Sequence, residues 1–135
     1  YYVVDKEIPM KLSDWCRVHI SSRITFLLLL NLGLLVTGCF MDIFSATIVV
    51  VPLILPIAEV YGIHPVHLGV IFLANLELGY LTPPVGLNLF LAAYRFEEPL
   101  TKVYRNVVPF LAALLVAVLL ITYIPPMTTC LLPAK

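Results

Sequence analysis

The stretch GYLTPPVGLNLF, residues 79–90, decides how this chain can fold. It lies in one of the most apolar parts of the sequence, where a continuous membrane helix would be expected. Proline lacks the backbone donor of a helix, clashes with the preceding turn, and pushes the residue before it away from helical angles. Two prolines, Pro83 and Pro84, occur here in succession and are followed closely by Gly86. We therefore expect two half-helices separated by an unwound segment at residues 81–86.

The composition is typical of a membrane protein. Hydrophobic residues make up 61% of the chain and charged residues 12%, whereas a soluble domain has roughly half and about a quarter. Between Arg23 and Arg95 there is no lysine or arginine, and the acidic residues there are Asp42, Glu59 and Glu77. The sequence predicts an all-α integral membrane protein.

Several function classes find no support in the residues. The formal net charge is zero and no basic patch is interleaved with aromatic residues, so no nucleic-acid partner is expected. The three cysteines are far apart and form no CxxC pair, which argues against a metal centre or a redox motif. Ser45, His64 and Asp42 have no nucleophile motif around them, which disfavours an intramembrane hydrolase. We expect no enzyme activity, no catalytic residue and no cofactor.

The apolar run at residues 24–58 contains one charge, Asp42. A division at Gly38 leaves a first arm of 14 residues, about 21 Å long at about 1.5 Å per residue, against a hydrocarbon core of about 30 Å. A re-entrant helical hairpin over residues 24–60 fits this length. Its tip would lie at residues 38–42, where glycine permits a tight turn and the aspartate caps the returning helix. Two tilted or shortened spans remain the alternative.

The remaining segments are assigned from hydropathy and from the positions of proline residues, which bend or end helices. We expect an interfacial amphipathic arm at 1–23, a hairpin arm bent or ended by Pro52 and Pro56, a broken transmembrane helix at 65–94, a polar loop at 95–106, a spanning helix at 107–124 and a tail at 125–135. Four basic residues on one face against three on the other do not decide the orientation by the positive-inside rule.

Two broken elements in one short chain are the pattern by which secondary transporters build sites at the membrane midplane. The N-termini of half-helices attract anions, whereas unwound carbonyl groups and helix C-termini coordinate cations. The two interruptions therefore predict a cation site, and sodium is a hard cation that requires several oxygen ligands. The candidate cation-binding residues are Gly38, Asp42, Thr82, Pro83 and Gly86.

Four further residues near the break are candidates for the substrate path or for supporting the site, namely Asn75, Glu77, Pro84 and Asn88. Glu77 could relay a proton, pair with a basic group elsewhere, or act as a structural hydrogen-bonding group. An acid inside a membrane segment is a functional hypothesis by default, because its charge is costly there.

Two other polar pairs receive structural interpretations. His64 and His67 flank Pro65 and suggest a metal pair only weakly, so a helix-start pair at the interface is favoured. Asn31 and Gly33 interrupt a leucine run, which close helix packing explains.

The order and spacing of four motifs resemble a known family. The motifs are the G-x-F-x-D tip at Gly38, Phe40 and Asp42, the prolines Pro52 and Pro56, GIHPVHLG at 62–69 and LTPPVGLNLF at 81–90. Through them the chain resembles the C-terminal region of the large membrane (permease) subunit of tripartite ATP-independent periplasmic (TRAP) transporters, and the similarity covers nearly the whole chain.

The resemblance implies a sodium-coupled, elevator-type secondary transporter of the ion-transporter superfamily, in the bacterial inner membrane. Such a permease imports organic acids such as C4-dicarboxylates or sialic acid, together with a small membrane subunit and a periplasmic substrate-binding protein. Sodium would be the coupling ion, and no other metal is implied. The chain would be most of the second of two inverted repeats, a fragment that needs the N-terminal half of the subunit. The hairpin would open to the periplasm, residues 95–106 would form a cytoplasmic loop, and residues 125–135 would form a periplasmic tail.

The alternative is a channel, or another secondary carrier subunit with midplane broken helices, because broken helices also line ion filters. A channel predicts conductance that does not depend on a soluble binding protein, and a symmetric oligomer in place of inverted repeats.

Overall fold

The computed structural model describes residues 8–83 and 85–130, and every regular element among them is a helix. The expectation of an all-α membrane protein is consistent with this, and α3, α4 and α7 are long and apolar enough to cross a membrane. The helices are α2 (Ile8–His19), α3 (Arg23–Phe40), α4 (Ile43–Val60), α5 (Pro65–Tyr80), α6 (Leu87–Phe96), α7 (Leu100–Tyr123) and α8 (Pro126–Thr129).

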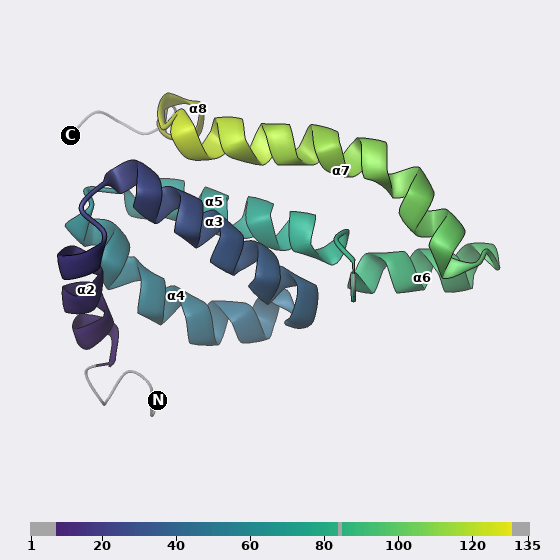
Figure 1. The fold of residues 1–135 in the computed structure, drawn as a ribbon, viewed down its shortest axis with the longest axis horizontal. Helices are drawn as coiled ribbons and strands as arrows, with labels where there is room; N and C mark the ends of the chain where they lie inside the picture. The colour runs from purple at the N-terminus through teal and green to yellow at the C-terminus, as the bar shows by residue number, and fades with distance from the viewer. Residues whose placement is uncertain (1–7, 84, 131–135) are drawn as a thin grey trace.

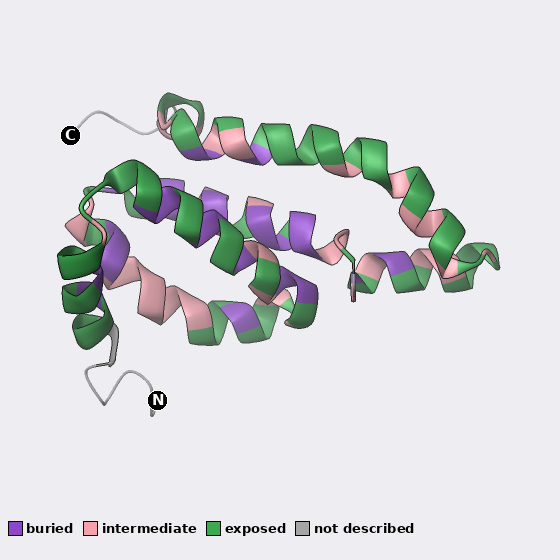
Figure 2. Cartoon of the chain, viewed as in Figure 1, coloured by how far each residue is buried: buried purple, intermediate pink, exposed green. Residues whose placement is uncertain are grey.

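The centre of the fold is the pair α3 and α5, which make the most extensive contact between any two helices (Figure 1). α4 folds back from the end of α3 toward α2, and α7 returns along α5 so that α8 lies near the start of α5. Buried residues concentrate on the facing sides of α3 and α5, whereas most of α7 is exposed (Figure 2). The largest buried apolar side chains on these faces include Phe26, Leu34, Ile71 and Leu76.

Tyr61 links α2 to the hairpin formed by α3 and α4. Its hydroxyl lies 2.6 Å from the carbonyl oxygen of Ile20 and 3.1 Å from that of Cys16, and its ring stacks on Phe26 with centroids 4.5 Å apart. These carbonyls lie at the C-terminal end of α2. The carbonyl of Cys16 also accepts from the amide of Ile20 at 2.7 Å, whereas that of Ile20 lies beyond the last residue of the helix. Burial raises the pKa of the Tyr61 phenol, so the hydroxyl remains a donor to still higher pH than an exposed tyrosine would.

We expect Tyr61→Phe to keep the stacked ring but to remove the donor, with a loss of about 1 kcal/mol in the free energy of unfolding. Amide hydrogen exchange in detergent micelles should show faster exchange in α2. The control is Tyr94→Phe, because Tyr94 is 87% exposed. Equal effects of the two variants would contradict the assignment.

The tip of the hairpin differs from the expectation that Gly38 makes the turn. α3 continues through Gly38 to Phe40, and the chain reverses at Met41 and Asp42. The Met41 amide donates to the carbonyl of Thr37 at 2.8 Å, which closes the last turn of α3. The first arm therefore has 18 residues instead of 14, so its length no longer separates a re-entrant hairpin from two spans.

The expectation that Pro52 or Pro56 ends the second arm is wrong in part, because α4 runs through both prolines to Val60. Each proline removes one backbone donor but leaves the other helical bonds in place. α2 and α5 pack against α4, and this packing holds the helix together across the missing bonds.

The polar loop expected at 95–106 is mostly helix. α7 begins at Leu100, which leaves only residues 97–99 as a connection from α6. The expected boundary at Val107 marked where the helix becomes apolar, and a polar segment can form the first turns of the same helix. Pro109 lies inside α7, and Figure 1 shows that the helix bends in its first half.

Candidate functional site

The tip of the hairpin and the break in the second element meet where α3 crosses α5. A Cβ atom placed on Gly79 would lie 2.7 Å from the Cα and carbonyl carbon of Gly38, and one placed on Gly38 would lie 3.0 Å from the Cα of Leu76. The two backbones touch because neither glycine has a side chain. Since Gly38 and Gly79 both lie in the last turn of their helices, the C-termini of α3 and α5 lie side by side.

Two further contacts join the tip to the break. The thiol of Cys39 lies 3.8 Å from the carbonyl oxygen of Thr82, a weak hydrogen bond. The hydroxyl of Tyr80 interacts with the backbone of Ile43, the first residue of α4. The charge of Asp42 also acts on this hydroxyl. The residues at the two interruptions, about forty positions apart in the chain, therefore form one cluster.

The electrostatics of this cluster favour a cation. Each helix C-terminus carries a partial charge equivalent to about −0.5 on its unpaired carbonyl groups. Two such ends lie together at Gly38 and Gly79, and the carboxylate of Asp42 follows the end of α3 by two residues, at the N-cap of α4.

The backbone of the break offers oxygen atoms. The amides of Leu81 and Thr82 still bond to Leu78 and Gly79, which ends α5. Beyond them, the carbonyl oxygens of residues 81–83 accept no backbone hydrogen bond from the described part of the chain. The Thr82 hydroxyl donates its proton to Leu78 at 2.7 Å, which leaves its oxygen lone pairs available to a ligand.

Gly86 closes the break from the other side. It is the N-cap of α6 in a left-handed conformation, with φ of 44°, which favours glycine. A Cβ atom at this position would lie 3.1 Å from the carbonyl oxygen of Thr82. The glycine thus lets the start of α6 approach the end of α5 closely.

Asp42 caps α4. Its Oδ2 atom accepts hydrogen bonds from the amides of Phe44 at 2.9 Å and Ser45 at 3.0 Å. Aspartate is among the best N-cap residues, because its oxygen satisfies amides that have no helical acceptor. The second carboxylate oxygen can accept a further ligand, so capping and cation binding are chemically compatible.

The structure also places the other candidate residues. Pro83 is exposed at the break, Glu77 is exposed on α5, and Asn88 is half-buried in the first turn of α6. Pro84 lies outside the described residues. Among those that the structure does describe, no group of three or more histidine, cysteine, aspartate or glutamate residues could hold a metal ion.

Asn75 lies in a buried hydrogen-bond network inside the helix packing. Its Nδ2 atom donates to Asn31 Oδ1 at 2.7 Å and to the carbonyl of Ile71 at 2.8 Å, so both amide protons are committed away from the break. Close packing does explain Asn31, but not Gly33, which is exposed and has open space where its Cβ would be.

His64 and His67 both lie at the start of α5, as expected for a helix-start pair, but they play different parts. His64 caps α5 and accepts a hydrogen bond from the amide of Val66 at 3.2 Å. His67 is 1% exposed and lies 2.6 Å from the Thr128 hydroxyl and 3.2 Å from the Thr122 carbonyl. This joins α5 to α7 and α8, because a buried imidazole needs partners for its ring nitrogens.

Sequence reasoning missed Gly79 and Tyr80, and it considered Cys39 only for a backbone carbonyl at the tip and not for its thiol. A signal existed for Gly79, because it is a small residue within one turn of a helix end, as Gly38 is. Small residues at helix interfaces let backbones approach closely in membranes. For Cys39 and Tyr80 no local pattern would have shown that they face the other interruption.

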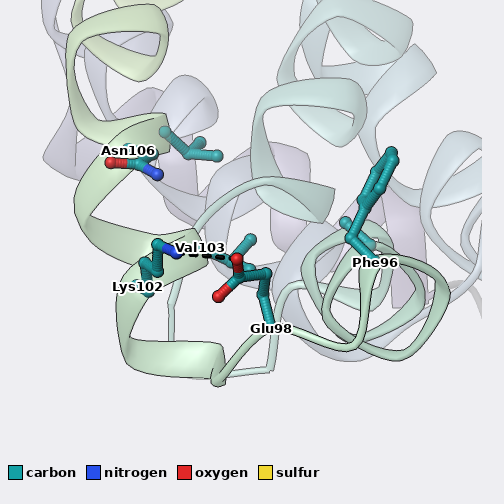
Figure 3. Close-up of a pocket in the computed structure, with 7 residues that line it drawn as sticks. Phe96, Glu98, Lys102, Val103 and Asn106 are labelled. Atoms are coloured by element: carbon teal, nitrogen blue, oxygen red, sulfur yellow. Dashed lines mark hydrogen bonds and ion pairs between the residues drawn. The ribbon is translucent and has the colours of Figure 1, made fainter.

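A separate hollow of about 440 Å³ lies between α6 and α7 and is shown in Figure 3. Lys102 and Glu98 form an ion pair of 2.6 Å across it. Both side chains are exposed, so the ion pair is a solvated contact between the connection before α7 and the first turn of α7, and it contributes little to stability. This hollow carries no feature of a binding site.

Comparison with known proteins identifies what the chain is similar to. A family model described as "Tripartite ATP-independent periplasmic transporter, DctM component" matches residues 1–127. The C4-dicarboxylate TRAP transporter large permease protein DctM of Pseudomonas aeruginosa is 37% identical over 97% of this chain, which covers 31% of that protein. The sialic acid TRAP transporter large permease protein SiaM of Vibrio cholerae is 33% identical over 97% of this chain and 31% of its own length. The isethionate TRAP transporter permease protein DctMQ of Oleidesulfovibrio alaskensis is 35% identical over 89% of this chain and 19% of its own length.

Proposed function

Because this chain belongs to the DctM family of tripartite ATP-independent periplasmic transporters, we propose that it contributes a sodium site to a secondary transporter of organic acids. The family members that it resembles are transporter permeases and not enzymes. The chain spans about a third of the length of its DctM and SiaM relatives, so transport itself is proposed for the full-length permease.

The observation that carries the proposal is the meeting of two helix C-termini at Gly38 and Gly79. A cation placed beside this contact would face the negative ends of two helix dipoles at once. The carbonyl oxygens of residues 81–83 are free of backbone partners among the described residues and would serve as ligands. Thr82 would add its hydroxyl oxygen, and Asp42 would supply the negative charge.

On the other side of the break lies the N-terminus of α6, which is the positive end of that helix dipole. α6 begins at Gly86 without a side-chain cap, so its first amides are available to an anion. We propose that a substrate carboxylate is held from this side, with Asn88 in the first turn of α6 as a supporting donor. The substrates named for the relatives are C4-dicarboxylates, sialic acid and isethionate, all of them organic acids.

We further propose that the permease lies in the bacterial inner membrane and works with a small membrane subunit and a periplasmic substrate-binding protein. The hairpin of α3 and α4 would be re-entrant from the periplasmic side, with the connection from α6 to α7 on the cytoplasmic side. The periplasmic and cytoplasmic sides are proposed from the family to which the chain belongs. The arrangement of the chain adds only that the start of α5 and the end of α7 lie at one end of the molecule.

The experiment that tests the sodium site replaces Thr82 with valine in the full-length permease. The variant keeps the side-chain shape but loses one oxygen ligand, so the sodium concentration for half-maximal uptake should rise about tenfold. Uptake is measured in vesicles that also contain the small subunit, with the binding protein supplied outside.

The matched control is Thr47→Val. Thr47 also donates its hydroxyl proton to a carbonyl four residues earlier, the one of Ile43 at 2.6 Å, but it lies on the exposed surface of α4. Its sodium dependence should be unchanged. A Thr82→Val permease with normal sodium dependence would argue against the proposed ligand.

A further inference from the structure

A groove of about 290 Å³ runs between α3, α5 and α7. Its exposed edges are apolar and include Leu28, Leu32 and Leu115. Its floor contains the side chains of Asn31 and Asn75, which are 8% and 2% exposed. A polar floor under leucine walls is unusual beside α3 and α7, which are both apolar enough to cross a membrane.

One atom of this floor has no partner. Asn31 Oδ1 accepts hydrogen bonds from Asn75 Nδ2 at 2.7 Å and Thr122 Oγ1 at 3.2 Å. Asn31 Nδ2 is buried and has no hydrogen-bond partner among the described residues. The assignment of oxygen and nitrogen in this amide follows from the network, because Asn75 Nδ2 also donates to Ile71. A buried donor without an acceptor is costly, and most costly where water is excluded.

Three kinds of occupant are considered as the source of an acceptor for Asn31 Nδ2, and the depth and apolar walls of the groove favour one of them. A water molecule needs two to four polar partners, and the walls are almost wholly apolar. A lipid chain has no acceptor at this depth, because Asn31 lies about 12 Å along α3 from Arg23 at about 1.5 Å per residue. A membrane helix can bring an acceptor to this depth on an otherwise apolar surface.

We propose that a membrane-spanning helix with a hydrogen-bond acceptor opposite Asn31 packs into this groove in the full-length permease. The DctM relative is about three times as long as the region that it shares with this chain, and we place the helix in the part of the permease outside that region. The volume of the groove suits the side chains of such a helix and not a whole helix, as in ridges-into-grooves packing. The proposal does not depend on the sodium site, because Asn31 lies two turns of α3 from Gly38.

The test is photocrosslinking in membranes, with benzoylphenylalanine at Leu115 of the full-length permease. The matched control is Val116, which is also exposed on α7 but does not line the groove. The expected result is a crosslink from position 115 to one membrane helix outside the shared region, with an acceptor side chain or free carbonyl near the crosslinked residue. Position 116 should not give that crosslink. A crosslink from position 115 to lipid, to a second copy or to another subunit, or no crosslink at all, would overturn the proposal.

A second measurement tests the donor itself. Asn31→Leu replaces the amide by an apolar side chain of similar size, and the yield of the crosslink from position 115 should fall about threefold to tenfold. Thr122→Val removes the hydroxyl that donates to Asn31 Oδ1 and to the carbonyl of Val118, but it leaves the Asn31 donor in place, so the yield should not change. Equal losses in the two variants would show that the donor does not hold the helix.

Discussion

Replacing Gly79 with alanine is expected to destabilise the protein by about 2–3 kcal/mol and to separate the hairpin tip from the break. The new Cβ would lie 2.7 Å from two backbone atoms of Gly38 and 3.0 Å from the amide nitrogen of Cys39. Backbone atoms inside two packed helices cannot move aside as the end of a side chain can. The expected loss of stability therefore lies at the upper end of the range for substitutions that overpack a core. The measurement is the free energy of unfolding of the full-length permease in mixed micelles with increasing denaturing detergent.

The control for this variant is Gly69→Ala in the same helix. No atom lies within 4 Å of a Cβ placed on Gly69, and alanine has the higher helix propensity, so we expect no loss and a gain of up to about 1 kcal/mol. If Gly79→Ala were as stable as Gly69→Ala, the contact between Gly38 and Gly79 would not be what holds the two interruptions together. Uptake by the Gly79→Ala permease should also be lost. The proposed sodium ligands lie at the tip and at the break, and the glycine contact holds these two parts together.

Asp42→Asn is expected to have the largest effect on sodium coupling. Asparagine caps helices about as well as aspartate, so α4 should keep its bonds from Phe44 and Ser45. The negative charge beside the two helix C-termini is lost. Because interactions with an ionised ligand are roughly twice as strong as those with a neutral one, we expect the sodium concentration for half-maximal uptake to rise about a hundredfold.

Comparison with Asp42→Ala separates the two roles of this residue. Alanine removes the cap as well as the charge, so this variant should lose a further 0.5–2 kcal/mol or so of stability. The two variants should share the same defect in sodium dependence and differ in stability. Normal sodium dependence in Asp42→Asn, with a defect only in Asp42→Ala, would mean that the residue acts as a cap and not as a ligand.

The elements that could be predicted are those whose cause is local. Pro83 and Gly86 interrupt a helix through their own backbone chemistry, and the structure has α5 end at Tyr80 and α6 begin at Leu87. Asp42 caps the helix that follows it, because a capping bond spans only two or three residues. The helical ends at Phe40 and Leu100 were missed, because hydropathy describes how apolar a helix is and not where its hydrogen bonds begin.

The candidate site was predictable only in outline. Thr82 and Gly86 belong to the break, so their proximity follows from local sequence. That Cys39 faces Thr82, 43 positions away, depends on how α3 crosses α5. The use of Asn75 in packing was missed for the same reason, because its partner Asn31 lies 44 positions away on another helix.

The sequence by itself determined the membrane class of the protein, the family resemblance, and the positions of the two interruptions, because apolar composition, proline and glycine act on the backbone within a few residues. Only the tertiary structure decided that the interruptions meet through Gly38 and Gly79. It also decided that Asn31 joins α3 to α5 and α7, with one of its donors unpaired within residues 8–83 and 85–130. The physical reason is that helix crossing is set by the summed packing of many apolar side chains. Many sequences share that apolar pattern. Which two glycines touch is therefore known only from the way the helices pack.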